Sequence, residues 1–237
     1  MSRADGRRPD QLRPVEIVPD YLEQPHGSAL YVQGKTRVLC TASIEESVPR
    51  WMSGRGTGWI TAEYSLLPAS TGQRTQREAS SGRQKGRTVE IQRLIGRAVR
   101  AVTDFRALGE RTLWLDCDVL QADGGTRCAA ISGAYVAAAR ALGRFGLSKA
   151  MPGSVAAVSL GIVGGELLLD LDYSEDSAAD VDLNVVMTGD ERLVEVQATA
   201  EQVPFGRAEL DELLELATKG IARIREAQQE AVDASRL

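Results

Sequence analysis

The stretch from residue 113 to residue 140 constrains the fold of this chain more than any other. Its first half alternates strictly, because Trp114, Asp116 and Asp118 separate four apolar residues, Leu113, Leu115, Cys117 and Val119, which predicts a strand. Two adjacent glycines, Gly124 and Gly125, then end the strand, since they adopt backbone angles that side chains forbid. From about Arg127 the sequence is rich in alanine and apolar almost all round, which predicts a buried helix.

The turn between this strand and this helix carries the first candidate site. Thr126 is the expected N-cap of the helix, and Arg127 follows it directly. A helix N-terminus offers unpaired N–H groups and the positive end of the helix dipole, and an arginine adds a fork of donors. Residues 125–127 therefore predict an anion site, although a plain strand–turn–helix connection has the same pattern.

A basic block precedes this unit in an otherwise acidic chain. Residues 74–106 contain nine Arg or Lys and three acidic residues, whereas the whole chain contains 28 and 33. A helix is predicted over 88–104, with one apolar face and an opposite face carrying Arg93, Arg97 and Arg100. Such a block indicates a localised surface for a polyanion; the alternative is a solvated charged helix.

An acidic cluster forms the second candidate site. In the strand expected from residue 180, Asp180, Asp182 and Asn184 share one face, and Asp176 lies on the turn before it. Converging carboxylates suit a hard cation such as Mg2+, which binds a few carboxylates and keeps its waters. The alternative is an exposed hairpin with acidic side chains.

Several function classes are excluded by what the chain lacks. It has one histidine, His26, in a Pro-His-Gly turn, so its chemistry is expected to proceed without an imidazole base. Its three cysteines are odd in number and have no C-x-x-C spacing, which predicts structural thiols in a reducing cytoplasm rather than a zinc site. No run of 18 apolar residues and no signal-peptide pattern occur, so no membrane association is expected.

The order of the expected elements predicts an α+β fold with mixed sheets packed on helices. Hairpins are expected around residues 34–36, 164–165 and 189–190, and an amphipathic helix over 206–230. Each half of the chain then runs as a group of strands followed by a helix. We interpret residues 1–237 as a single domain, with a short flexible arm over about 1–10 and a basic loop over about 69–87.

These features together favour one reaction. A nucleophile that is already anionic needs no general base, but it is repelled by the phosphodiester that it attacks. Arginines and a divalent ion relieve that repulsion. Inorganic phosphate attacking an RNA phosphodiester therefore fits this set of residues better than water does.

The chain also resembles the bacterial ribonuclease PH family. The similarity extends from Asp5-Gly-Arg7 to the C-terminal helix, and its signature segments lie in the family's order: Gly86 to Arg97, Leu120 to Arg127, Glu175-Asp-Ser, and Val181 to Val186. The resemblance implies two βαβ-type halves of the kind shared with a ribosomal protein domain. It also implies a phosphate-dependent 3′→5′ exoribonuclease that trims tRNA precursors and other RNA 3′ ends in the cytoplasm, releases nucleoside diphosphates and forms a homohexamer, a trimer of dimers.

The resemblance further implies roles for individual residues. The phosphate ligands are Arg87, Gly125, Thr126 and Arg127, and the metal carboxylates, for Mg2+ or Mn2+, are Asp176 and Asp182. Arg87, Arg127, Asp176 and Asp182 form the expected catalytic set. Arg74 and Arg77 match arginines that serve tRNA binding or ring assembly in the family, and Arg93 and Arg97 extend the expected RNA-binding surface.

Two other functions compete with this interpretation. A non-catalytic RNA-binding subunit of an exosome-like ring would have lost Arg127 or one of the two metal carboxylates, and this chain keeps all three. A hydrolytic metal-dependent nuclease would not need an arginine-lined anion pocket, because water is its nucleophile.

Overall fold

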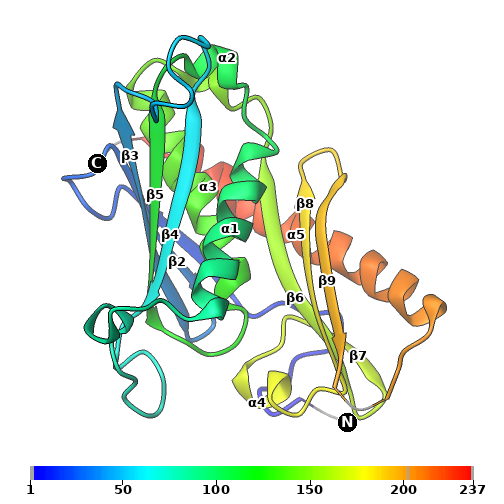
Figure 1. Ribbon diagram of the computed structural model, residues 1–237. Helices are drawn as coiled ribbons and strands as arrows, with labels where there is room; N and C mark the ends of the chain where they lie inside the picture. Colours follow the sequence, from blue (N-terminus) through cyan, green and yellow to red (C-terminus); the bar gives the residue numbers. More distant parts are fainter. Residues whose placement is uncertain (1–2, 202, 236–237) are drawn as a thin grey trace.

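The computed structural model describes residues 3–201 and 203–235 and contains two sheets (Figure 1). The first sheet has five strands in the order β1-β2-β3-β5-β4, and all neighbours are antiparallel except β4 and β5. Its strands are β1 (Val15–Pro19), β2 (Gly27–Gln33), β3 (Thr36–Glu45), β4 (Trp59–Leu66) and β5 (Thr112–Gln121). The expected alternation in β5 is confirmed, because Leu113, Leu115, Cys117 and Val119 are buried and Trp114 and Asp118 are exposed.

The second sheet has four antiparallel strands in the order β7-β6-β8-β9. They are β6 (Val155–Val163), β7 (Glu166–Leu169), β8 (Val181–Thr188) and β9 (Leu193–Ala200). The hairpins expected around residues 164–165 and 189–190 are therefore confirmed. Short helices that the sequence did not predict lie at α2 (Phe105–Leu108) and α4 (Tyr173–Asp176), together with 3-10 turns at Glu78–Ser81 and Ser148–Ala150.

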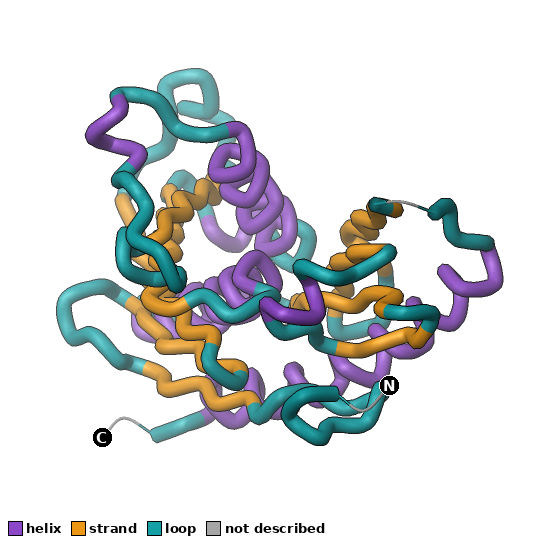
Figure 2. The backbone as a smooth tube through the Cα atoms, turned by 90° about the horizontal axis from the view of Figure 1, so that it is seen from below, coloured by secondary structure: helices purple, strands orange, loops and turns teal. Residues whose placement is uncertain are grey.

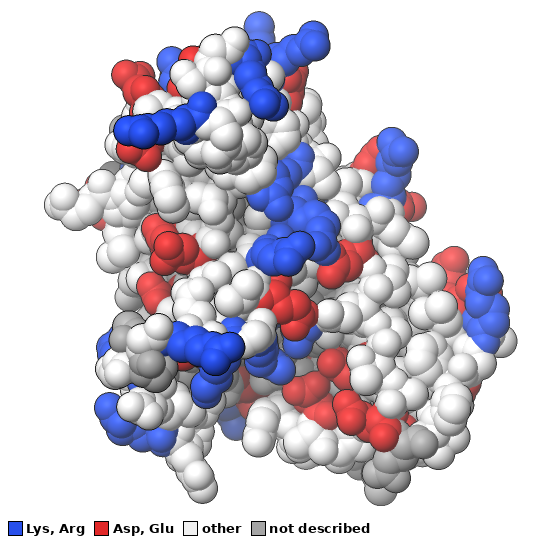
Figure 3. All heavy atoms as spheres, viewed as in Figure 1, with Lys and Arg blue, Asp and Glu red and all other residues white. Residues whose placement is uncertain are grey.

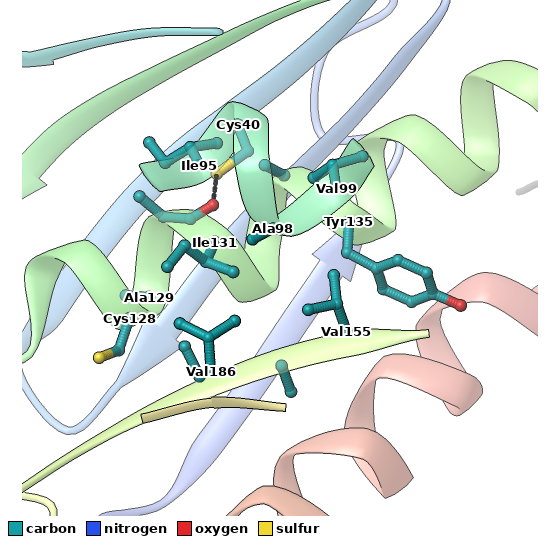
Figure 4. Packing of buried hydrophobic residues seen from close by; sticks show 14 of the residues in the cluster. Cys40, Ile95, Ala98, Val99, Cys128, Ala129, Ile131, Tyr135, Val155 and Val186 are labelled. Carbon is teal, nitrogen blue, oxygen red and sulfur yellow. Dashed lines mark hydrogen bonds between the residues drawn. The ribbon is translucent and has the colours of Figure 1, made fainter. Parts of the chain in front are cut away.

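Helix α3 (Thr126–Arg144) lies between the two sheets and forms the centre of the core. One side of α3 packs on β2, β3 and β5, and the other packs on β6. Helix α1 (Gly86–Arg100) covers β4 beside α3, and α5 (Arg207–Asp233) packs on β6. Figure 2 shows the sheets on either side of the helices, and Figure 4 shows Ile131 of α3 between α1 and Val186 of β8. Most buried hydrophobic side chains of both sheets belong to one continuous cluster, and Leu168 of β7 belongs to a small second one; the α+β architecture is confirmed.

The N-terminal arm is the main correction to the sequence interpretation. Residues 1–2 lie outside the described part of the chain, but residues 3–10 are not held loosely. Arg3 and Arg7 have exposed fractions of only 6% and 9%. Arg3 donates to both carboxylate oxygens of Glu175, at 2.7 and 2.6 Å, and Arg7 donates to the carbonyl of Asp170 at 2.9 Å. The charges of Arg3 and Arg7 therefore face protein partners rather than solvent.

Candidate active site

A cavity of about 710 Å³ brings the two predicted sites together. It lies where the ends of β4 and β5 in the first sheet meet β6 and β8 in the second. Its walls include all of the expected phosphate and metal residues: Arg87, Gly125, Thr126, Arg127, Asp176 and Asp182. The anion site and the carboxylates, which are separated by about fifty residues of sequence, thus face one space.

Two helices begin at this cavity. Arg87 is the second residue of α1, and Thr126 is the first residue of α3. The N–H groups of a first helical turn lack partners within the helix and carry the positive end of the dipole. The cavity therefore combines two helix N-termini with two arginines, and its chemistry at this end suits a phosphate group.

The turn before α3 differs in one detail from the expectation. Gly124 and Gly125 both have left-handed backbone angles, with φ of 76° and 66°, and Gly125 rather than Thr126 is the N-cap. The Thr126 hydroxyl instead accepts a hydrogen bond from the buried Tyr64 hydroxyl at 3.0 Å. That bond leaves the proton of Thr126 available to donate to an anion in the cavity.

Arg127 is oriented by two side chains that the sequence did not single out. Its Nη1 donates to Gln197 of β9 and to Glu90 of α1, the latter at 3.4 Å, and Gln197 donates to Glu90 at 2.7 Å. The Arg127 side chain has an exposed fraction of 13%. Glu90 from the first lobe (β1–β5 with α1–α3) and Gln197 from the second lobe (β6–β9 with α4 and α5) thus hold one edge of the Arg127 guanidinium, and Arg127 also lines the cavity.

The carboxylates Asp176 and Asp182 line the same cavity. Asp182 and Asn184 share one face of β8, as expected, and the Asn184 amide donates to the Asp182 carboxylate at 3.3 Å. Asp176 ends α4. Burial and the negative charge of Asp176 raise the pKa of Asp182, and partial loss of hydration raises the pKa of Asp176 despite the nearby Arg87 and Arg127. Asp180 does not line the cavity, because its carboxylate accepts from the Gly164 N–H at 3.0 Å.

This donor set fits a hard divalent cation. Asp176 and Asp182 present carboxylate oxygen atoms, which Mg2+ and Mn2+ prefer, and a cation would favour the ionised form of Asp182, whose pKa is raised by burial and by the charge of Asp176. The Asn184 amide supports Asp182 rather than the cation, because its nitrogen donates to Asp182 and its oxygen accepts from the Cys128 thiol at 3.3 Å. Among the described residues, no group of three or more His, Cys, Asp or Glu side chains could hold a metal ion. Two carboxylates therefore leave coordination positions for water and for substrate oxygens.

Ser159 of β6 is a further polar residue of this cavity that the sequence did not reveal. Its side chain lies beneath Gly125, and the residue has an exposed fraction of 5%. Within the described residues its hydroxyl has no hydrogen-bond partner. A lone serine in the apolar strand Val155–Val163 has no sequence signal that separates it from core residues.

The RNA-binding arginines expected on α1 lie outside this cavity. Arg93 and Arg97 line a neighbouring hollow of about 920 Å³ with Lys85 and Glu90, and Arg97 pairs with Glu195 of β9. Figure 3 shows Lys and Arg side chains gathered over α1 on this face. Arg74 and Arg77 are exposed in the basic loop, and Arg77 lines a separate cleft with Asp116 and Asp118. Because Glu90 also contacts Arg127, the basic hollow borders the candidate active site.

Comparison with known proteins agrees with this geometry. Residues 11–142 match domain 1 of the 3′ exoribonuclease family, and residues 153–220 match its domain 2. The chain is 58% identical to ribonuclease PH of Syntrophomonas wolfei, covering 94% of this chain and 96% of that one. It is 57% identical to ribonuclease PH of Frankia casuarinae, covering 98% and 94%.

The fold is also similar to a solved exosome chain. A chain of the Archaeoglobus fulgidus exosome, solved with RNA bound to the active site, superposes with a TM-score of 0.79. It is 25% identical, and the match covers 95% of this chain and 92% of that one. In the described part of this chain, no helix has the length and apolar character needed to cross a membrane. The chain belongs to the 3′ exoribonuclease family, with the two-domain ribonuclease PH fold and a phosphate-dependent 3′→5′ exoribonuclease activity that makes it a nucleotidyltransferase.

Proposed function

We propose that the 710 Å³ cavity is the phosphorolytic site and that its substrates are the 3′ ends of tRNA precursors and other RNAs in the cytoplasm. One observation carries the proposal. The arginines and helix N-termini line the same cavity as the carboxylates Asp176 and Asp182, and Arg87 and Arg127 lie close enough to Asp176 to act on its pKa. A phosphate ion held by the arginines would therefore lie near a phosphodiester placed at the carboxylates.

In this proposal, the arginine side of the cavity binds phosphate and the carboxylates bind the metal ion. Arg87, Arg127, the Thr126 hydroxyl and the N–H groups of α3 bind inorganic phosphate and spread its charge. Asp176 and Asp182 would hold Mg2+ or Mn2+, which would supply charge stabilisation at the scissile phosphate, and Asn184 orients Asp182.

The reaction then needs no base from the protein. An oxygen of the hydrogen phosphate ion bonds to the phosphorus of the terminal phosphodiester, and the bond from that phosphorus to the 3′ oxygen of the preceding nucleotide breaks. The leaving oxygen takes the proton that the hydrogen phosphate ion brought and becomes a hydroxyl. The products are a nucleoside diphosphate and an RNA shortened by one nucleotide. The only histidine of the chain, His26, does not line the cavity. Its Nδ1 accepts from the Ile44 N–H at 2.8 Å, at the end of β3 opposite to Thr36, which contacts the turn before α3.

Phosphate dependence is the direct test. With 3′-extended tRNA, Mg2+ and phosphate, we expect release of nucleoside diphosphates, and with excess nucleoside diphosphate we expect the RNA to lengthen. Without phosphate, release should stop, because the arginine wall binds an anion rather than water. Chromatography of the released nucleotides distinguishes the outcomes; nucleoside monophosphates formed equally well without phosphate would contradict the proposal.

We further propose that the chain forms a homohexamer built as a trimer of dimers. The similarity to an exosome chain supports assembly. So does the edge strand β9, where Leu193 and Val196 have exposed fractions of 53% and 37%. Arg74 and Arg77 stand in the exposed basic loop, where they are available either to RNA or to a second copy.

Replacing both Arg74 and Arg77 with alanine separates these roles. If they contact RNA phosphates, tRNA binding weakens most at low salt, and the salt dependence of log K falls by roughly one unit per lost contact. The matched control is Arg207→Ala with Arg223→Ala, which removes two exposed arginines of α5. Sedimentation of the same samples shows whether the variant has become a dimer. Unchanged tRNA binding in an intact hexamer would leave the basic loop without its proposed role.

A further inference from the structure

A buried ion pair lies next to the turn before α3, which lines the candidate active site. Arg13, just before β1, and Asp170, just after β7, have exposed fractions of 5% and 1%. The Arg13 guanidinium donates to both carboxylate oxygens of Asp170, at 2.7 and 3.0 Å, and its backbone N–H donates to the same carboxylate at 2.7 Å. Asp170 has a left-handed backbone with φ of 59°, a conformation that a non-glycine residue keeps only where its surroundings hold it.

Arg13 also supports the phosphate-binding turn. Its Nη1 donates to the carbonyl of Asp123, and its Nη2 lies 3.5 Å from where a side chain on Gly125 would begin. The neighbouring Gly124 fits against the second lobe so closely that a Cβ there would lie 2.4 Å from the carbonyl oxygen of Leu171. One guanidinium thus joins the turn before α3 to the segment that leads into α4.

Two further arginines continue this network to the metal side. Arg3 forms a two-point ion pair with Glu175, and it also donates to the carbonyl oxygens of Leu169 and Asp170, at 2.8 and 2.7 Å. Arg7 pairs with Asp170 and Glu175. Glu175 belongs to the capping box of α4, and Asp176 follows it. The N-terminal arm therefore contacts the segment that leads into α4 and also Glu175, the neighbour of the proposed metal ligand Asp176.

We infer that Arg13 and Asp170 are a positioning pair, which sets the phosphate turn of the first lobe against the carboxylate helix α4 of the second, with Arg3 fixing the α4 side. The inference rests on the proposed function of the cavity. Neither Arg13 nor Asp170 lines that cavity, so they act through the backbone of residues 123–125 and 171–176. A side chain that binds phosphate directly would instead face the same space as Arg87 and Arg127.

The test compares Arg13→Lys and Arg3→Lys. Each substitution keeps the positive charge but loses the planar set of N–H donors of the guanidinium. Phosphate affinity is measured without RNA, from the rise in melting temperature with phosphate concentration, and Mn2+ affinity is measured by electron paramagnetic resonance. Loss of a partner that orients a binding group commonly costs about tenfold or more. We expect Arg13→Lys to weaken phosphate binding by about that factor and leave Mn2+ binding nearly unchanged, because it supports the turn. Arg3→Lys should show the opposite pattern.

The matched control is Arg8→Lys, an arginine of the same arm whose side chain is 76% exposed and pairs with Asp10; it should change neither affinity. If Arg13→Lys does not fold, Asp170→Asn is measured in the same way. A variant that melts at a lower temperature yet binds phosphate as the parent does would overturn the inference, because the pair would then be only structural. Arg127→Lys is measured alongside: if it too leaves phosphate binding unchanged, the proposed phosphate site itself is wrong.

Discussion

Replacing Asp182 with asparagine is expected to abolish turnover while leaving the fold and tRNA binding largely intact. Asparagine keeps the shape of the side chain but removes one of the two carboxylates proposed to hold the divalent ion. Charge stabilisation by such an ion is worth several kcal/mol, and each 1.36 kcal/mol is tenfold in rate, so the loss is expected to be about a thousandfold or more. Initial rates across Mg2+ concentrations provide the measurement. Near-normal turnover at limiting Mg2+ would show that the metal assignment is wrong.

The same substitution should stabilise the metal-free protein at neutral pH. Burial and the charge of Asp176 raise the pKa of Asp182, so folding favours its protonated form. That favourable contribution is complete below the ordinary aspartate pKa of 3.8 and is lost as the pH rises through the raised pKa of the folded state. At pH 7 the ionised carboxylate therefore opposes folding, and asparagine removes the conflict.

Thermal unfolding in a chelator measures this effect. The melting temperature of Asp182→Asn should exceed that of the parent at pH 7 and approach it near pH 3. Asp190→Asn, in the turn between β8 and β9, is the control, because a hydrogen bond from Thr188 lowers the pKa of Asp190. That carboxylate favours folding when ionised, so its removal should not stabilise the protein. A lower melting temperature for Asp182→Asn at pH 7 would contradict the interpretation.

Arg127→Lys should raise the KM for phosphate strongly and change RNA affinity little. Lysine keeps the charge, but it cannot bond to the Glu90–Gln197 pair through one nitrogen while offering others to phosphate. A lost hydrogen bond to a charged group commonly costs about 1.5–3 kcal/mol, or roughly ten- to 150-fold in KM. RNA contacts are expected to be spread over the arginines of the basic loop and α1, which this substitution leaves in place.

Two measurements separate the roles of Arg127. Initial rates are measured across phosphate concentrations, and tRNA binding is measured without phosphate. Arg223→Lys, on the exposed face of α5, is the control for changing an arginine at the surface. Weaker tRNA binding with an unchanged phosphate KM would mean that Arg127 belongs to the RNA surface instead.

The sequence predicts the local geometry of the site well, because that geometry depends on residues that lie close together in the chain. A period of two places Asp182 and Asn184 on one face of β8, and adjacent glycines with Arg127 after them mark the turn before α3. The cap is displaced by one residue, to Gly125, because both glycines are left-handed. Asp180 follows the same alternation as Asp182 and Asn184 but does not line the cavity. It lies just before β8, and its carboxylate accepts a hydrogen bond from the Gly164 N–H.

What the sequence does not predict depends on pairs far apart in the chain. Arg3 and Arg7 suggest a solvated arm because their partners, Asp170 and Glu175, lie more than 150 residues away, and the same separation hides the pairing of Arg13 with Asp170. Glu90 and Gln197 contact Arg127 from different lobes, and no local pattern links them. Such contacts follow from how the sheets dock on α3, which is a property of packing rather than of spacing.

Gly124 of the first lobe packs on Leu171 of the second, so the candidate active site lies where the two lobes dock. This position has a consequence for when a newly made chain becomes active. The first lobe contains both arginines proposed to bind phosphate, and the second contains both carboxylates proposed to bind the metal, so on this proposal neither lobe alone holds a complete site. During synthesis the first lobe emerges early with α3 covered on one side only, and the face of α3 that packs on β6 must wait for the second sheet. A newly made chain is therefore expected to gain its activity only when the second sheet docks on α3.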